Sequence, residues 1–326
     1  MNIRLNEYII WGRNVALSRF GFKIFSVNLE VTKKCNARCI FCNYWKTKQE
    51  SHLLDYVPII KHLDPITVVI TGGEPLLRND IVEIITDLKK EKPLLRVSMI
   101  TNGILLTADI ATALYNAGLD QLSISLDFLD ERHDLNRGHK GLSMHIMEII
   151  KKIDAKGMGL SLNTVIMKEN LDVVLDIAKW AAEQGISVGY SCYSDVKTHN
   201  RSHMVPPAEN KDLIEIIDGL VLHKRFVGNI TNSEYYLRRI PKYFRNGRIE
   251  SCQAGIRWLQ VTPEGHLKRC SEHPIQCDWS EYSKDAFAAT QCGRCWFACR
   301  GESQAPLQWS RVKKYGAFLL RKVIAQ

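Results

Sequence analysis

Two kinds of segment alternate along the first two-thirds of the chain. Short apolar runs rich in β-branched residues predict strands at 23–31, 66–70, 95–100, 119–126, 160–167 and 186–193. Longer segments with apolar residues at helical spacing predict helices at 53–63, 79–91, 107–117, 142–157, 171–184 and 208–224. Strands that alternate with helices of this length indicate parallel β-α-β units. We therefore predict six such units, with ligands bound at the carboxyl ends of the strands.

Capping residues support several of the predicted helix boundaries. Asn79 and Thr107 are of the type that starts a helix, and Gly118, Gly157 and Gly185 each follow a predicted helix end. The pattern does not distinguish a doubly wound sheet from an incomplete barrel, because both are built from these units.

The pattern changes near residue 195. The polar stretch 194–210 contains paired prolines and predicts a long loop before another helix, and from 251 onward short strand-like pieces and cysteines replace the long helices. This change indicates a second, smaller domain. The predicted organisation is a basic, aromatic helical extension at 1–22, a core at 23–200, connecting loops and helices at 201–250, a cysteine-rich domain at 251–302 and a basic amphipathic tail at 303–326.

Composition narrows the class of protein. The chain has 326 residues, of which 45% are hydrophobic and 24% charged, and this excludes wholesale disorder. No stretch approaches the roughly 18 apolar residues of a membrane span, and the N-terminus lacks the continuous apolar segment of a secretory signal. We therefore expect a cytoplasmic protein. The net charge of +9 suggests an anionic partner, but the basic residues are dispersed and carry no nucleic-acid-binding motif, so no specific nucleic acid is expected.

Both ends of the chain combine basic and aromatic residues. At helical spacing, the segment 309–326 places apolar residues on one face and basic residues on the other. Such segments either dock on their own domain with a solvated charged face or lie on an anionic membrane surface. Peripheral contact with an anionic membrane is therefore one possible partnership.

Three cysteines follow the first predicted strand directly, where this kind of fold places its chemistry. Cys35, Cys39 and Cys42 lie in "CNARCIFC", among ten cysteines in the chain. In a reducing compartment, clustered cysteines are more often metal ligands than disulfides. Three thiolates can hold three irons of a four-iron cluster and leave the fourth iron open. The alternative is a zinc site with a fourth ligand from elsewhere, such as His52.

The spacing Cx₃Cx₂C, with the aromatic Phe41 before the last cysteine, resembles the radical S-adenosylmethionine (radical SAM) enzymes. The resemblance implies a partial (β/α)6 TIM-like barrel and a [4Fe–4S] cluster whose open iron binds S-adenosylmethionine (SAM). It also implies a reducing partner such as flavodoxin or ferredoxin. Reductive cleavage of SAM would then give a 5′-deoxyadenosyl radical that abstracts hydrogen from a substrate.

Further motifs follow in the order found in that family. "ITGGEPLLR" ends the second predicted strand, "MITNG" ends the third, and "SISLD" with "RHDLNRG" follows the fourth. The glycines allow close backbone approach to a ligand, and the acid can pair with an ammonium group. The resemblance implies SAM-binding roles for Phe41, Gly72, Gly73, Glu74, Asn102, Ser125 and Arg137.

Cys192 ends the sixth predicted strand and stands apart from the other cysteines. A thiol near the substrate can act in catalysis by donating hydrogen to quench a product radical. A lone strand cysteine is also commonly a small buried hydrophobe. Both interpretations stay open from the sequence.

A second cysteine group fills the C-terminal region. "CQAGIRWLQVTPEGHLKRC" resembles the opening of the SPASM and twitch extensions of radical SAM enzymes, and residues 263–265 predict a turn between two short strands. The resemblance implies one auxiliary [4Fe–4S] cluster for electron transfer on Cys252, Cys270, Cys292 and Cys295. Cys277 and Cys299 are then spare, or one of them replaces a named ligand. A structural zinc site is the alternative.

The sequence limits the substrate only loosely. Relatives with these extensions modify peptides, protein side chains, sugars and small alcohols, so a peptide or protein side chain is favoured, and a lipid or small alcohol is open. Two other classes of protein compete with a radical SAM enzyme. One is a non-catalytic iron–sulfur electron carrier, and the other is a zinc-containing nucleic-acid-binding protein.

Overall fold

The computed structural model describes residues 5–20, 23–48, 50–153, 159–283, 287 and 290–306. Its strands are β1 (Ser26–Thr32), β2 (Thr67–Gly72), β3 (Arg96–Thr101), β4 (Gln121–Ser125), β5 (Gly159–Ile166), β6 (Ser187–Cys192), β7 (Trp258–Val261), β8 (His266–Lys268) and β9 (Ile275–Asp278). Its helices are α1 (Leu5–Arg19), α2 (Val57–Leu63), α3 (Ile81–Glu91), α4 (Ala108–Asn116), α5 (Arg132–Arg137), α6 (Leu142–Lys152), α7 (Val174–Glu183), α8 (Asn210–Phe226), α9 (Glu234–Leu237), α10 (Ile240–Asn246) and α11 (Ala298–Gln304).

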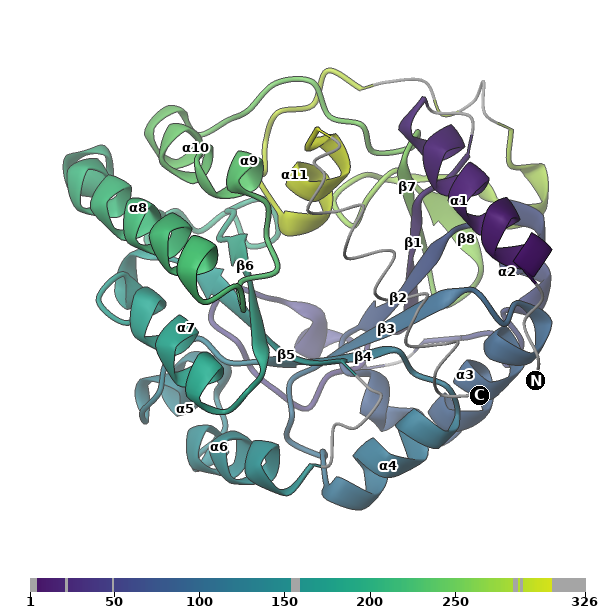
Figure 1. The fold of residues 1–326 in the computed structure, drawn as a ribbon, viewed down its shortest axis with the longest axis horizontal. Helices are drawn as coiled ribbons and strands as arrows, with labels where there is room; N and C mark the ends of the chain where they lie inside the picture. The colour runs from purple at the N-terminus through teal and green to yellow at the C-terminus, as the bar shows by residue number, and fades with distance from the viewer. Residues whose placement is uncertain are drawn as a thin grey trace.

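The strands form one sheet in the order β6-β5-β4-β3-β2-β1-β7-β8-β9. Strands β1 to β6 are parallel and neighbour one another in chain order. A doubly wound sheet would reverse direction at a switch point, whereas this order never reverses between β1 and β6. Figure 1 shows the strands as an arc with α3 to α8 on its outer side. The prediction of a partial barrel is therefore confirmed.

Alternating burial fixes which face of each strand meets the helices. On β1, Val27, Leu29 and Val31 are fully buried in the main hydrophobic core. On α3, the buried residues Ile81, Ile84, Ile85 and Leu88 follow the helical period and form one apolar stripe. The aliphatic core lies between the sheet and the outer helices, and the intervening strand residues face the inside of the arc.

The observed helix ends test the predicted caps. Thr107 does cap α4, since its hydroxyl accepts a 3.2 Å hydrogen bond from the backbone N–H of Ile110. The prediction for Asn79 is wrong, because α3 starts one residue later with Asp80 at the N-cap position. Gly118 and Gly185 follow helices with φ of +98° and +69°, as expected of helix-terminating glycines. Residue 157 lies outside the described residues.

The cysteine-rich segment continues the main sheet. Strand β7 pairs in parallel with β1, in the register Ser26↔Trp258 and Asn28↔Gln260. Strand β8 then returns antiparallel to β7, as the predicted turn at 263–265 requires. The predicted domain boundary at residue 251 therefore does not separate two sheets.

Two short helices, α5 and α11, were not predicted from the sequence, and α9 and α10 lie in the segment 201–250, where helices were predicted without bounds. In Figure 1, α11 lies on the inner side of the arc of strands, and it contacts β6 and α9. Most of the predicted basic tail, residues 307–326, lies outside the described residues, so its amphipathic character and membrane contact stay predictions. No helix in the described ranges is long and apolar enough to span a membrane.

Candidate active site

The three-cysteine loop leaves the carboxyl end of β1 and is pinned to α5. Two backbone hydrogen bonds make this connection, from Arg38 N–H to Arg137 O at 2.8 Å and from Ile40 N–H to Asn136 O at 3.1 Å. Cys39 is buried in this loop, while Cys35 and Cys42 are partly exposed. The loop is therefore positioned by the element that follows β4, as the order of the sequence motifs suggests.

Gly72 and Gly73 bring the end of β2 against the same loop. The backbone N–H of Gly73 donates to Thr32 O at 2.7 Å, and that of Glu74 donates to Lys34 O at 2.9 Å. A Cβ atom on Gly72 or on Gly73 would lie 2.1 Å from one of these two carbonyl oxygens. Only glycine fits at either position, so both glycines set the path of the chain just before Cys35.

The Glu74 carboxylate is buried and connects the ends of β2 and β3. It accepts hydrogen bonds from Thr101 Oγ1 at 2.7 Å, from the backbone N–H of Asn102 at 2.7 Å and from that of Leu76 at 3.0 Å. Burial raises the pKa of Glu74, and these hydrogen bonds oppose the rise. The Asn102 side chain reaches toward the loop, with its Nδ2 3.8 Å from Cys35 Sγ.

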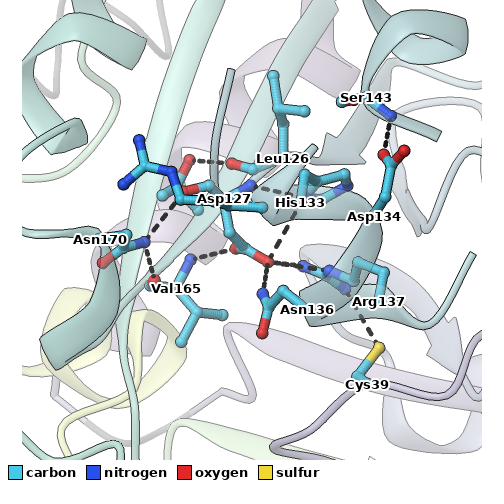
Figure 2. A network of polar contacts seen from close by, with 12 residues as sticks. Cys39, Leu126, Asp127, His133, Asp134, Asn136, Arg137, Ser143, Val165 and Asn170 are labelled. Atoms are coloured by element: carbon cyan, nitrogen blue, oxygen red, sulfur yellow. Dashed lines mark hydrogen bonds and ion pairs between the residues drawn. The ribbon is translucent and has the colours of Figure 1, made fainter. Parts of the chain in front are cut away.

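Arg137 joins the cysteine loop to a buried polar network. Its guanidinium Nη1 lies 3.8 Å from Cys39 Sγ, and its Nε and Nη2 lie 2.9 and 2.7 Å from Asp127 Oδ2. The guanidinium also lies over the Phe41 ring, 5.0 Å from its centroid. Figure 2 shows Arg137 between Asp127 and Cys39. The SAM-binding role of Arg137 stays a prediction, and the carboxylate that pairs with Arg137 within the protein is that of Asp127.

The Asp127 carboxylate is the centre of that network. Besides Arg137, it accepts from Asn136 Nδ2 at 2.8 Å and from the backbone N–H of Val165 at 2.9 Å. The backbone N–H of Asp127 donates to His133 Nδ1 at 3.1 Å, and burial lowers the pKa of His133 to about 4. His133 is therefore neutral at neutral pH. The motifs "SISLD" and "RHDLNRG" indicated that this segment takes part in the site. They did not show that the Asp127 carboxylate is the shared hydrogen-bond acceptor of the network.

Burial and one distant cation set the electrostatics of the thiols. Burial raises the pKa of Cys35 to about 11, and burial also raises the pKa of Cys39. The cation that most strongly opposes this rise at Cys39 is Arg137 of α5, which lies about a hundred residues away in the sequence. The ammonium Nζ of Lys33, a basic residue just before the loop, lies 3.4 Å from Glu264 Oε1. Metal binding here would release protons, because thiolates are the ligating form.

Two further predicted residues lie at strand ends. Ser125 ends β4, is 6% exposed and pairs in register with Asn163 of β5. Cys192 ends β6, is buried, and has its Sγ 3.5 Å from the Tyr236 hydroxyl. Burial raises the pKa of Cys192, and the nearby Cys295 adds to the rise. Its proposed role as a hydrogen donor stays a prediction.

The second cysteine group does assemble in space. Cys252 and Cys270 are buried together, and Cys292 and Cys299 pack against them. The pKa of Cys295 is raised by burial and by Cys270 and Cys252, so all four predicted ligands and the spare Cys299 form one group. Cys277 lies apart on β9, at the edge of the main core.

A buried arginine holds this second group in place. Arg300 is 0% exposed, and its guanidinium donates to Cys295 O at 2.5 Å and to Glu250 O at 3.0 Å. Its charge also lowers the pKa of Cys252 and of Cys295, against the effect of burial. The positive charge therefore stabilises the thiolate forms that ligate metals.

The zinc alternatives stay open for both cysteine groups. Within the described part of the chain, no three His, Cys, Asp or Glu side chains lie close enough together to hold a single metal ion. His52, the alternative fourth ligand of the first site, is exposed.

Comparisons with known proteins agree with this geometry. The family described as the Radical SAM superfamily matches residues 29–181. A GTP 3′,8-cyclase of Listeria welshimeri is 31% identical over 275 residues, which cover 77% of this chain and 80% of that protein. A GTP 3′,8-cyclase of Paenarthrobacter nicotinovorans is 31% identical over 219 residues, but the match spans only 61% of its length.

The fold is also similar to that of solved structures. The structure of Streptococcus suis SuiB bound to S-adenosylmethionine gives a TM-score of 0.65 at 17% identity, covering 87% of this chain and 72% of that one. The chain belongs to the radical SAM superfamily. Members of this superfamily use a [4Fe–4S] cluster and SAM, and the donor set at Cys35, Cys39 and Cys42 is chemically suited to that cluster.

Proposed function

We propose that this protein is a radical SAM enzyme that removes a hydrogen atom from a polar small molecule, with GTP as the first candidate substrate. The observation that supports it best is the three-thiol loop after β1, held by Gly73 at the end of β2 and by Arg137 of α5. An electron carrier needs a closed cluster, and it has no use for a three-thiol site or for the residues assembled around it.

Each residue of the site has a proposed task. Cys35, Cys39 and Cys42 would hold three irons of a [4Fe–4S] cluster, and Phe41, Gly72, Gly73, Glu74, Asn102, Ser125 and Arg137 would position SAM. Cys252, Cys270, Cys292 and Cys295 would hold the auxiliary [4Fe–4S] cluster. When bound, these groups supply electron transfer and the reductive cleavage of SAM to a 5′-deoxyadenosyl radical.

The names of the curated relatives and the net charge of the chain support GTP as the first candidate substrate. The sequence favoured a peptide or protein side chain, but the curated relatives described above are named GTP 3′,8-cyclases. The likeness to SuiB rests on 17% identity and supports the fold alone. A net charge of +9 also favours an anionic substrate such as a nucleoside triphosphate.

The proposal is tested by product analysis under anaerobic conditions. Reconstituted protein is reduced and incubated with SAM, with and without GTP, and 5′-deoxyadenosine and any cyclised nucleotide are quantified by mass spectrometry. We expect deoxyadenosine from the wild type, more of it with GTP, and none from Cys39→Ala. Cys277→Ala is the matched control and should retain activity. If wild-type protein loaded with iron and sulfide formed no 5′-deoxyadenosine, the proposed radical SAM activity would be refuted. If it formed 5′-deoxyadenosine but no nucleotide product, only the proposal that GTP is the substrate would be refuted.

The auxiliary cluster has its own test. Wild-type protein should carry about eight irons per chain, and Cys295→Ala about four. The variant should still cleave SAM while its substrate-dependent turnover falls. Unchanged product formation by Cys295→Ala would remove the second cysteine group from the reaction.

A further inference from the structure

Three buried polar atoms on β1 and β7 have no hydrogen-bond partner in the described structure. They are Oε1 of Glu30, Oε1 of Gln260 and Nε1 of Trp258. The three residues are only 1%, 2% and 3% exposed, so bulk water does not reach them freely. An unpaired buried polar group destabilises a fold, and folded proteins satisfy nearly all of them. Three such atoms on two adjacent strands therefore point to a polar ligand that supplies the missing partners.

The strand register places these atoms on one face of the sheet. Ser26 lies beside Trp258 and Asn28 beside Gln260, and Glu30 follows Asn28 by two residues on the same face. The opposite face, which carries Leu29 and Val261, belongs to the core under the helices. Figure 1 shows β1 beside β7 in the arc of strands. The three polar side chains therefore face the inside of the partial barrel.

The two ends of this row meet the two cysteine groups. Trp258 packs with the buried Cys252 and Cys270. At the other end, the Glu30 carboxylate accepts a hydrogen bond from the Tyr44 hydroxyl, and Tyr44 lies two residues after Cys42. Four residues of strand separate the level of Trp258 from that of Glu30, a distance of about 13 Å. The row thus runs between the first thiol site and the second.

We propose that Glu30, Gln260 and Trp258 form a substrate-binding subsite for a polar molecule that carries hydroxyl or amino donors. The inference rests on the proposed function, since it names the part of the molecule that receives the substrate. Two of the free atoms are acceptors and one is a donor, so a ligand with at least two O–H or N–H groups and one acceptor satisfies all three. A purine nucleotide has such groups on its sugar and base. A lipid chain would leave all three unpaired.

The subsite gives each residue a distinct role in positioning. Glu30 can accept a charge-assisted hydrogen bond beside the three-cysteine loop, which is about twice as strong as a neutral one. Gln260 accepts near the middle of the row, and the Trp258 indole can only donate. A substrate held at both ends of the row is fixed relative to the first site, as hydrogen abstraction from one chosen carbon requires.

The test compares Gln260→Met, which removes the free acceptor at similar volume, with Gln121→Met. Gln121 is a strand glutamine whose amide is already partnered, by Ser161 Oγ at 3.0 Å. GTP binding to reconstituted protein with SAM is measured by anaerobic calorimetry, together with iron content, SAM affinity and the melting temperature. We expect Gln260→Met to raise the Kd for GTP about tenfold, from the loss of one buried hydrogen bond. Its iron content and SAM affinity should be unchanged. Glu30→Gln, which removes the charge alone, should also raise the Kd, and Gln121→Met should not.

Each outcome decides one of the two proposals. Equal GTP affinity in wild type, Gln260→Met and Glu30→Gln would overturn the subsite and leave GTP as a candidate. If the wild type cleaves SAM but does not bind GTP, GTP is refuted as the substrate. The melting temperature of Gln260→Met then decides whether the subsite exists. Removing an acceptor with no partner leaves that temperature unchanged or raises it, which supports the subsite. A clear fall would show that Gln260 is structural and would overturn the subsite.

Discussion

The Asp127 network offers the most direct test of how the cysteine loop is held. Asp127→Asn keeps the size of the side chain but removes its charge. The Arg137 guanidinium, which is almost fully buried and lies 2.7 Å from Asp127 Oδ2, then loses its anionic partner. Breaking a buried ion pair on one side costs about 3–5 kcal/mol, because the remaining charge is left uncompensated.

This cost converts to a measurable shift in melting temperature. Unfolding entropy of about 2.1 cal/mol/K per residue amounts to about 0.7 kcal/mol per kelvin for this chain. The expected fall is therefore about 4–7 °C. Anaerobic thermal unfolding of the reconstituted protein, followed by far-UV circular dichroism at one scan rate, measures it.

Two further variants make the reasoning refutable. Asp176→Asn removes an exposed carboxylate that pairs with Lys179 at 2.9 Å, and such pairs contribute about 0.3–0.5 kcal/mol, so its melting temperature should fall by less than about 1 °C. The double variant Asp127→Asn/Arg137→Met should recover part of the lost stability, because no buried charge is then left unpaired. If Asp127→Asn were as mild as Asp176→Asn, the ion pair would not be what holds the loop.

Three other predictions concern single residues. Burial lowers the pKa of His133 from 6.5 to about 4, so the unfolded chain binds a proton that the folded chain does not, and the stability present above about pH 6.5 is lost as the pH falls toward 4. His133→Gln should remove about 2 kcal/mol of the stability difference between about pH 7 and about pH 5, measured by urea titration of the variant and the wild type at both pH values. Gly73→Ala should lower iron loading and abolish SAM cleavage because its Cβ meets a carbonyl of the cysteine loop, whereas Gly12→Ala, with open space around it, should change neither. Cys299→Ser should weaken retention of the auxiliary iron, measured by iron analysis after gel filtration, because the Cys299 side chain packs against the buried group that contains Cys252 and Cys270.

Most of the fold could be predicted from local patterns in the sequence. The apolar periodicity located all six barrel strands to within a few residues. It could do so because the apolar side chains of each strand pack into the core and are therefore visible in the sequence. It missed α5, where "RHDLNR" has no apolar stripe and the helix is held instead by the polar contacts of Asp127 and Arg137. It also placed the start of α3 at Asn79, because both Asn79 and Asp80 are good capping types and only the backbone decides between them.

Site residues that are close in the sequence could be predicted from their spacing. Site residues that meet only through strand pairing could not. The spacing of Cys35, Cys39 and Cys42 pointed to the first site without any knowledge of the fold. No sequence pattern showed that Gln260 would lie beside Asn28, because that neighbour relation depends on the pairing of β7 with β1. The row of unpaired polar atoms is therefore visible only in three dimensions.

The pairing of β7 with β1 has a consequence for how the chain is made. The first strand emerges from the ribosome early, but the partner for its free edge is synthesised more than two hundred residues later. At about 5–20 residues per second, that edge waits roughly 10–50 s for its neighbour. During this interval its unpaired amides are open to strands of other nascent chains. We therefore expect a chain truncated before β7 to keep this edge of β1 unpaired and to aggregate more readily than the full chain.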